Sequence, residues 1–344
     1  MKGDSAAFLI ASGTAVLVGS ALLSAFLILV LHPLLKRYAM AQPNPRSSHK
    51  VPTPQGGGMA VIATVLAVFC VVSYFLPPGA AAILRFPIIF AAVVLIAGVG
   101  VIADIHPKNV GARLLLQALA VAAIAFVLSP QTRVLPILPL PVERILLIIG
   151  GVWFVNLVNF MDGLDWMTVA EVVPISAALA VIGLFGVLPV PAITVSLALC
   201  GAMIGFAFFN RPVAKLFLGD VGSLPIGLLL GWLLVLLAGN GGRAAAILLP
   251  LYYLADSSIT LVRRAFNGET IWRAHRSHFY QRATDRGLSV IDVVGRVFSV
   301  NLGLAALAIL TVTAQSRATD IAALAGGAAL VVGLLYSLTR RRSI

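Results

Sequence analysis

Amide and carboxylate side chains are concentrated in one short stretch of a chain that is otherwise strongly apolar. Asn156, Asn159, Asp162 and Asp165 follow one another at intervals of three residues. Residues three or four apart lie on the same face of a helix, so a helix that continues through this stretch would carry two amides and two carboxylates along one stripe. Charged groups are costly near a bilayer. This concentration of polar groups therefore predicts a functional site.

A second stretch, residues 210–223, places a carboxylate between two glycines. Gly219 and Gly222 flank Asp220, and glycine allows a backbone to approach a ligand closely. Ser223 follows at the start of an apolar run, where the free N–H groups of a helix N-terminus favour an anion. The structural alternative is an ordinary helix cap, in which Asp220 or Ser223 satisfies those N–H groups.

A third stretch is strongly basic. His275-Arg276-Ser277-His278 lies among seven arginines between residues 263 and 296, including Arg282. Guanidinium groups form a fork that matches phosphate oxygens, whereas the same cations would repel a divalent metal from the two histidines. The stretch therefore predicts a diphosphate site, with attraction to anionic lipid headgroups as the alternative. Asp256, in the preceding apolar segment, is expected to pair with this cluster rather than to do chemistry.

A fourth carboxylate, Asp104, ends another apolar run, and alone it would be explained equally well as a solvated helix terminus. Taken together, carboxylates and phosphate-binding cations suit Mg²⁺ or Mn²⁺, which prefer oxygen ligands. Phosphoryl transfer needs mainly positioning and charge neutralisation. The chain has no G-x-x-x-x-G-K-[ST] sequence, so a P-loop ATPase is excluded.

Composition predicts a polytopic, all-α membrane protein. The chain of 344 residues is 60% hydrophobic and 10% charged, whereas soluble domains carry about 25% charged residues. A spanning helix needs about 20 mostly apolar residues. Eleven such segments are expected, or ten, because only Leu-Pro-Val-Pro divides the sixth from the seventh. The segments are Phe8–Leu31, Gly57–Leu76, Phe86–Ala103, Ala112–Ser129, Glu143–Asn159, Val169–Val187, Pro191–Phe209, Val221–Ala238, Ala244–Val262, Val293–Ala314 and Thr319–Leu338.

The distribution of basic residues predicts the orientation of this bundle. Eighteen of the 24 Lys and Arg residues fall in alternate loops on one side, which is therefore expected to be cytoplasmic, with the N-terminus outside and the C-terminus inside. The same bias accounts for the net charge of +12, so no nucleic-acid partner is expected. We expect one domain over residues 1–344, with an active site formed by cytoplasmic loops 32–56, 104–111, 160–168, 210–220 and 263–292.

The order of these motifs resembles that of the polyprenyl-phosphate N-acetylhexosamine-1-phosphate transferases, which include the phospho-N-acetylmuramoyl-pentapeptide transferases. The similarity runs from Pro52-Thr-Pro-Gln-Gly-Gly, through Asn159-Phe-Met-Asp162-Gly-Leu-Asp165 and Phe217-Leu-Gly-Asp220-Val-Gly-Ser, to His275-Arg-Ser-His278. The resemblance implies a bundle of ten or eleven spans, often dimeric, in a bacterial inner membrane. It also implies transfer of a sugar 1-phosphate from a UDP-N-acetylhexosamine to a polyprenyl phosphate.

Matching the motifs position by position implies roles for individual residues. The metal would be held by Asp220 and Asp162, and the uridine by Asn210 and Phe217. The diphosphate or sugar would be met by the basic cluster of His275, Arg276, His278 and Arg282. The expected catalytic group comprises Asp104, Asn159, Asp162 and Asp165, and the supporting residues are Asn156, Gly219, Ser223 and Asp256.

Two positions depart from the family pattern. Ala103 stands where the family usually has the first Asp of an Asp-Asp pair, and Trp166 stands where it usually has Gly. A phosphate monoester has a second pKa near 6 and is mostly dianionic at pH 7. We therefore expect direct attack by the lipid phosphate, with Asp104 orienting the acceptor or the metal. The His-Arg-Ser-His form is more similar to the branch that starts O-antigen or other surface glycans than to the peptidoglycan branch.

Two other functions remain open on the sequence alone. A transporter or lipid translocator would place polar groups at the middle of the membrane and on both faces, whereas here they gather at one face. A catalytically weak family member, suggested by Ala103, would bind the UDP-sugar or the lipid without turning it over.

Overall fold

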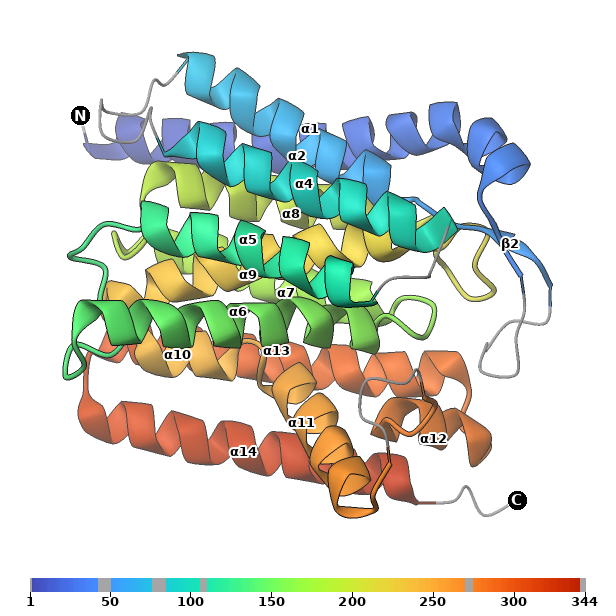
Figure 1. Cartoon of the computed structure of the whole chain (residues 1–344). Helices are drawn as coiled ribbons and strands as arrows, with labels where there is room; N and C mark the ends of the chain where they lie inside the picture. Colours follow the sequence, from blue (N-terminus) through green and yellow to red (C-terminus); the bar gives the residue numbers. More distant parts are fainter. Residues whose placement is uncertain (1, 43–50, 76–84, 106–109, 270–274, 341–344) are drawn as a thin grey trace.

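A computed structural model describes residues 2–42, 51–75, 85–105, 110–269 and 275–340, without the side chains of residues 2–10. Long helices run side by side and form most of the molecule (Figure 1). The helices are α1 Lys2–Tyr38, α2 Gly58–Phe75, α4 Phe86–Ile105, α5 Val110–Val127, α6 Leu140–Met161, α7 Met167–Gly183, α8 Val190–Ala207, α9 Asp220–Gly239, α10 Arg243–Leu248, α11 Leu251–Phe266, α12 Phe279–Asp285, α13 Val290–Ala314 and α14 Arg317–Thr339. Two short strands, β1 Met40–Ala41 and β2 Thr53–Pro54, pair antiparallel.

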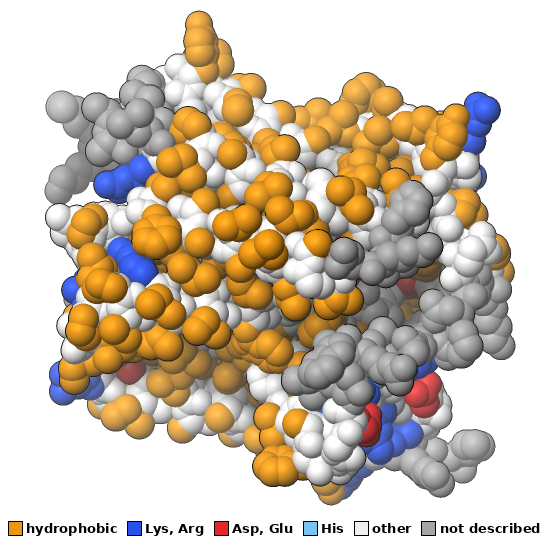
Figure 2. Space-filling model, viewed as in Figure 1, with side chains coloured by type: hydrophobic (Ala, Val, Ile, Leu, Met, Phe, Trp, Pro, Cys, Tyr) orange, Lys and Arg blue, Asp and Glu red, His pale blue; other side chains and the backbone are white. Residues whose placement is uncertain are grey.

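The predicted polytopic all-α membrane fold is confirmed. Nine helices in the described part of the chain are long and apolar enough to cross a membrane, and the shorter α7 is also apolar. Apolar side chains cover the flank of the bundle seen in Figure 2, while the acidic and basic side chains in this view lie toward its two ends. The chain begins at one end of the bundle and finishes at the other (Figure 1).

The predicted span Ala244–Val262 is not one straight helix. The structure divides it into α10 and α11 around Leu249 and Pro250, and α11 runs obliquely to the bundle (Figure 1). Proline lacks the N–H that would continue a helix, which accounts for the break. One face of α11 buries polar residues, including Asp256, whereas Phe266 and its apolar neighbours are exposed. The prediction was wrong here because hydropathy averages over both faces of an amphipathic helix.

Helix α9 lies at the centre of the bundle, and 83% of the residues in its most apolar 18-residue stretch are buried. Three glycines let other helices reach its N-terminal end. A Cβ on Gly58 of α2 would lie 2.1 Å from the Cα of Gly222, and a Cβ on Gly100 of α4 would lie 2.4 Å from the backbone N of Val221. These contacts hold α2 and α4 against the first turn of α9, where Asp220 begins the helix.

Replacing Gly100 by alanine is expected to push α4 away from the first turn of α9. Overpacking of this kind costs about 1–3 kcal/mol, so the Tm in detergent should fall by several degrees. Gly98→Ala is the matched control, because a Cβ on Gly98 of the same helix meets no atom within 4 Å. Equal Tm values for the two variants would contradict this packing.

Candidate active site

Asp220, the first residue of α9, lies beside the end of α6. The Nδ2 group of Asn159 donates to Oδ1 of Asp220 (2.7 Å) and to Oγ of Ser223 (2.9 Å). Asn159 and Asp220 are 61 residues apart in sequence, and the packing of α6 against α9 brings them together. The two motifs that the sequence singled out therefore form one site.

Asp104, at the end of α4, caps the N-terminus of α9. Its Oδ1 accepts a hydrogen bond from the backbone N–H of Asp220 (2.9 Å) and its Oδ2 accepts one from Val221 (3.2 Å). A carboxylate is favoured at this end of a helix. Gly219 has a φ of 78°, and a Cβ there would lie 2.7 Å from Oδ2 of Asp104. The glycine is thus needed both for its left-handed backbone conformation and for the approach of Asp104.

Arg113 belongs to the site, although sequence reasoning counted it only as a charge that sets orientation. Its Nη1 lies 3.0 Å from Oδ2 of Asp220, so the carboxylate is held between a cation from α5 and the amide of Asn159. One signal was available. Arg113 falls in the first turn of an apolar segment, where a cation is disfavoured by the helix dipole unless it has a partner.

Asp162 does not continue the predicted helical stripe, because α6 ends at Met161 and Asp162 is its C-cap. The Oγ1 hydroxyl of Thr168 donates to Oδ1 of Asp162. Burial raises the pKa of the Asp162 carboxyl to about 7, and the carboxylates of Asp220 and Asp165 add to the rise, while the bond from Thr168 opposes it. A carboxyl with this pKa exchanges its proton near neutral pH.

Three of the predicted site residues make buried structural contacts. Asn156 donates to Oε1 of Gln117 (2.7 Å) and so links α6 to α5. Asp165 accepts a hydrogen bond from the backbone N–H of Ala214 (3.0 Å), which joins loop 162–166 to loop 208–219. Asn210 donates to the backbone carbonyl of Leu216 (2.9 Å) inside that second loop. These bonds hold together helices and loops that carry other predicted site residues.

Trp166 explains why glycine is usual at its position. Its φ is 63°, in the left-handed region that favours glycine. Its backbone N–H donates to Oδ1 of Asn210 (2.7 Å), and its indole N–H donates to the carbonyl of Ala207 (2.7 Å). These bonds fasten the start of α7 to the end of α8 and to the loop that follows it. Phe217 is half-buried, and its backbone N–H donates to the carbonyl of Pro54 in β2 (2.8 Å).

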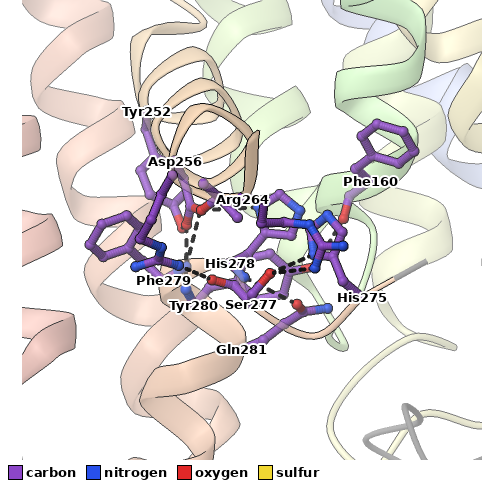
Figure 3. Close-up of polar contacts among 12 residues, drawn as sticks. Phe160, Tyr252, Asp256, Arg264, His275, Ser277, His278, Phe279, Tyr280 and Gln281 are labelled. Carbon is purple, nitrogen blue, oxygen red and sulfur yellow. Dashed lines mark hydrogen bonds and ion pairs between the residues drawn. The ribbon is translucent and has the colours of Figure 1, made fainter. Parts of the chain in front are cut away.

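The basic segment lies against the end of α6. The Tyr280 hydroxyl donates to the carbonyl of Phe160 (3.1 Å), and a Cβ on Gly163 would lie 2.2 Å from that hydroxyl. Figure 3 shows His275, Ser277 and His278 gathered between this contact and α11. His275 is half-buried, whereas His278 is buried. The basic segment and the end of α6 that carries Asn159 and Asp162 are thus neighbours in space.

The arginines of this segment differ in their surroundings. Arg276 pairs with Asp285 of α12 (2.9 Å), and Arg282 lies half-buried on α12. Arg263 donates to the carbonyl of Ser277 (2.8 Å) and so ties the segment to α11. Arg273, which the sequence also placed in the cluster, lies outside the described residues.

The side chains around Asp220 fit a magnesium site of the kind that substrate phosphates complete. No group of three or more His, Cys, Asp or Glu residues in the described segments forms a ready-made metal cage. Mg²⁺ is usually held by one or two carboxylates, with phosphates and water as its other ligands. Asp220 and Asp162 are close enough to interact electrostatically, and both supply the oxygen ligands that this ion prefers.

Comparison with known proteins finds a family match for the middle part of the chain. Residues 86–238, which carry Asp104, Asn159, Asp162 and Asp220, match the family model of glycosyl transferase family 4. The basic segment lies beyond the matched residues.

Two bacterial transferases are similar to the chain over most of its length, and a third over a shorter stretch. The chain is 27% identical over 304 residues to the probable undecaprenyl-phosphate N-acetylglucosaminyl 1-phosphate transferase of Bacillus subtilis, covering 81% of this chain and 82% of that protein. It is 29% identical over 339 residues to the decaprenyl-phosphate N-acetylglucosaminephosphotransferase of Mycobacterium leprae, covering 88% and 84%. A phospho-N-acetylmuramoyl-pentapeptide-transferase of Vesicomyosocius okutanii is 38% identical over 96 residues, covering 24% of this chain and 27% of that protein.

Proposed function

We propose that this protein transfers N-acetylhexosamine 1-phosphate from a UDP-sugar to a polyprenyl phosphate. An oxygen of the lipid phosphate attacks the sugar-linked phosphorus of the UDP-sugar and forms a new P–O–P bond. The bond from that phosphorus to the oxygen shared with the uridine phosphate breaks, and UMP leaves with that oxygen. The products are polyprenyl-diphospho-sugar and UMP. The names of the relatives in Bacillus and Mycobacterium favour N-acetylglucosamine as the sugar.

One observation carries this proposal. Asp220 lies at the N-terminus of α9 within hydrogen-bonding distance of Asn159 and Arg113, and the end of α6 that supplies Asn159 also contacts the basic segment through Tyr280. Carboxylates that can hold a divalent cation are therefore next to groups that can hold phosphates. Phosphoryl transfer needs this combination of positioning and charge neutralisation.

In this reaction Asp220 and Asp162 would hold Mg²⁺ or Mn²⁺, which when bound neutralises charge on the diphosphate oxygens. Asp104 fixes the first turn of α9 and so sets the position of Asp220. Arg113 pairs with Asp220 and so balances part of its charge. His275, Arg276 and Arg282 bind the diphosphate or the sugar, and the loop braced by Asn210, with Phe217 at its end, holds the uridine.

The proposal extends to the place of the reaction. The excess of Lys and Arg in one set of loops supports a cytoplasmic active site in the inner membrane of a bacterium, and the curated relatives reported above come from bacteria. The product would be the first lipid-linked sugar of a cell-surface glycan such as an O-antigen. A homodimer is part of the proposal, since the family resemblance implies one.

The test is release of UMP by purified protein with polyprenyl phosphate and Mg²⁺. The panel of donors is UDP-N-acetylglucosamine, its 6-deoxy relatives and UDP-N-acetylmuramoyl pentapeptide. We expect UMP from UDP-N-acetylglucosamine or from one or more of its 6-deoxy relatives. We expect no UMP when the lipid is left out. Absence of UMP with every donor, in protein that binds UDP, would overturn the proposal and favour a family member that binds without turnover.

Ala103 is the observation that favours this second candidate, because it removes the first carboxylate of the family pair. If the lipid phosphate attacks directly, Ala103→Asp should change kcat by less than about tenfold. Adding a missing acid–base group would raise kcat by about a hundredfold or more. Initial rates at saturating donor and lipid measure this. A gain of several hundredfold would show that the natural chain lacks a catalytic group.

A further inference from the structure

The carboxylate of Asp256 accepts hydrogen bonds from five donors. This α11 residue has no exposed surface. Its Oδ1 accepts from the backbone N–H of Phe279 (3.0 Å), the Nδ1 group of His278 (3.1 Å) and the hydroxyl of Thr260 (3.3 Å). Its Oδ2 accepts from the backbone N–H of Tyr280 (3.3 Å) and from the Tyr252 hydroxyl (3.2 Å). Figure 3 shows Tyr252, His278, Phe279 and Tyr280 around it.

Three of these donors belong to the segment that carries the basic cluster. Phe279 and Tyr280 are the first two residues of α12, and the N–H groups of a first helical turn have no partner within the helix. Asp256 supplies that partner from 23 and 24 residues away, in another helix. A buried carboxylate of this kind is costly unless its bonds are made, so the segment and α11 hold each other in one arrangement.

His278 is held by two stacked rings as well as by its bond to Asp256. Its ring stacks on His275 with centroids 4.9 Å apart and on Tyr280 with centroids 5.6 Å apart. It is 1% exposed. The carboxylate of Asp256 can only accept, so Nδ1 of His278 carries the hydrogen of that bond. Asp256 thereby sets the position of His278, and the stacked ring of His278 sets the position of His275.

Tyr280 connects Asp256 to the end of α6, which carries Asn159. Its backbone N–H is bound by Asp256, while its hydroxyl donates to the carbonyl of Phe160, between Asn159 and Asp162. One buried carboxylate in α11 thus fixes the distance between the basic segment and the end of α6.

We propose that Asp256 is a positioning residue that places the His275–Arg276 segment over the diphosphate of the bound nucleotide. The proposal rests on the proposed function, since it needs a nucleoside diphosphate at this site. The proposal predicts different effects on the two ends of the nucleotide. The second phosphate of UDP depends on the arrangement that Asp256 maintains, whereas the uridine end, held by the loop around Phe217, does not.

The test compares the Kd values of UDP and UMP, measured by titration calorimetry with Mg²⁺ on the full-length protein in detergent. In Asp256→Asn, an amide of the same shape must turn an N–H group toward at least one of the donors. We expect the Kd for UDP and the KM for the UDP-sugar to rise at least tenfold while the Kd for UMP changes less than twofold. The control is Ser257→Ala, since Ser257 is equally buried and its hydroxyl has no hydrogen-bond partner among the described residues.

A second variant covers the case in which Asp256→Asn does not fold. Tyr280→Phe keeps the ring and removes only the hydroxyl bond to Phe160, and it should weaken UDP binding in the same selective way. If both single variants fold, the double variant should weaken UDP binding by less than the product of the two single effects, because both residues act through one contact.

The outcomes distinguish this inference from the function on which it rests. Wild-type protein that fails to prefer UDP over UMP, or that releases no UMP from any donor, would overturn the proposed function. Active wild type together with an Asp256→Asn variant that keeps the wild-type Kd for UDP would overturn the positioning role alone. Equal weakening of UDP and UMP in both variants would also overturn it, by showing a general structural loss.

Discussion

Asp220→Asn is expected to lower kcat/KM for the UDP-sugar by about a thousandfold, the upper range for removing one preorganised electrostatic group. The variant loses a negative charge at the point where Asn159 and Arg113 converge. Its amide N–H group would face one of these two donors, so the side chain would also lose its fixed orientation. Initial rates of UMP release at a range of donor concentrations give this value.

The loss at Asp220 should be catalytic and should leave the fold intact. The backbone bonds from Asp220 and Val221 to Asp104 do not depend on the Asp220 carboxylate, so the Tm should stay within a few degrees of the wild type. Asp320→Asn is the matched control, because Asp320 lies in the first turn of another helix, α14. If Asp220→Asn keeps more than a tenth of wild-type activity, the carboxylate is not part of the metal–diphosphate site.

Magnesium binding should weaken strongly below neutral pH. Burial raises the pKa of Asp162 to about 7 in the metal-free protein, with Asp220 and Asp165 contributing. Since a metal ligand must be deprotonated, the proton competes with Mg²⁺ as pH falls through 7. A carboxyl with this pKa is about 25-fold less ionised at pH 5.5 than at pH 7.5. The apparent Kd for Mg²⁺ should therefore rise by about that factor, as measured by calorimetry or by the rise in Tm on adding Mg²⁺.

The sign of the accompanying stability change follows from the same pKa. The folded state binds the Asp162 proton more tightly than the unfolded state does, so this group makes the metal-free fold less stable as pH rises from about 4 to about 7. Mg²⁺ relieves that penalty, and its stabilising effect should grow with pH. Asp162→Asn should remove the part of the pH dependence that this carboxyl contributes. A variant that keeps the wild-type pH dependence would assign the titration to another group.

The sequence predicts the spanning helices well because lipid leaves the backbone no partner except itself, so every long apolar run must be helical. The exceptions have local physical causes. Pro250 divides one predicted span into two helices. The buried face of α11 carries Asp256, whose partners come from a distant part of the chain, and hydropathy does not record such contacts. The predicted stripe from Asn156 to Asp165 ends at Met161, where Asp162 becomes a cap.

The sequence identified several residues that the structure brings together, but not the contacts between them. Grouping polar residues by their expected membrane face brought Asn159 and Asp220 together, and the structure joins them directly. The pairing of Asp104 with the N-terminus of α9 and of Arg113 with Asp220 depends on how α4 and α5 pack, which one sequence does not encode locally. Tyr280 escaped notice for the same reason, since its partner is a backbone carbonyl 120 residues away.

The most direct test of sugar-phosphate transfer uses UDP-N-acetylglucosamine labelled with ³²P in the phosphate next to the sugar. Purified protein is incubated with this donor, polyprenyl phosphate and Mg²⁺, and the lipid fraction is separated from the nucleotides. The proposed reaction moves the label into the lipid in equal amount to the UMP formed, and the UMP carries none. Label that stays in a nucleotide while sugar enters the lipid, or lipid that gains neither, would contradict it.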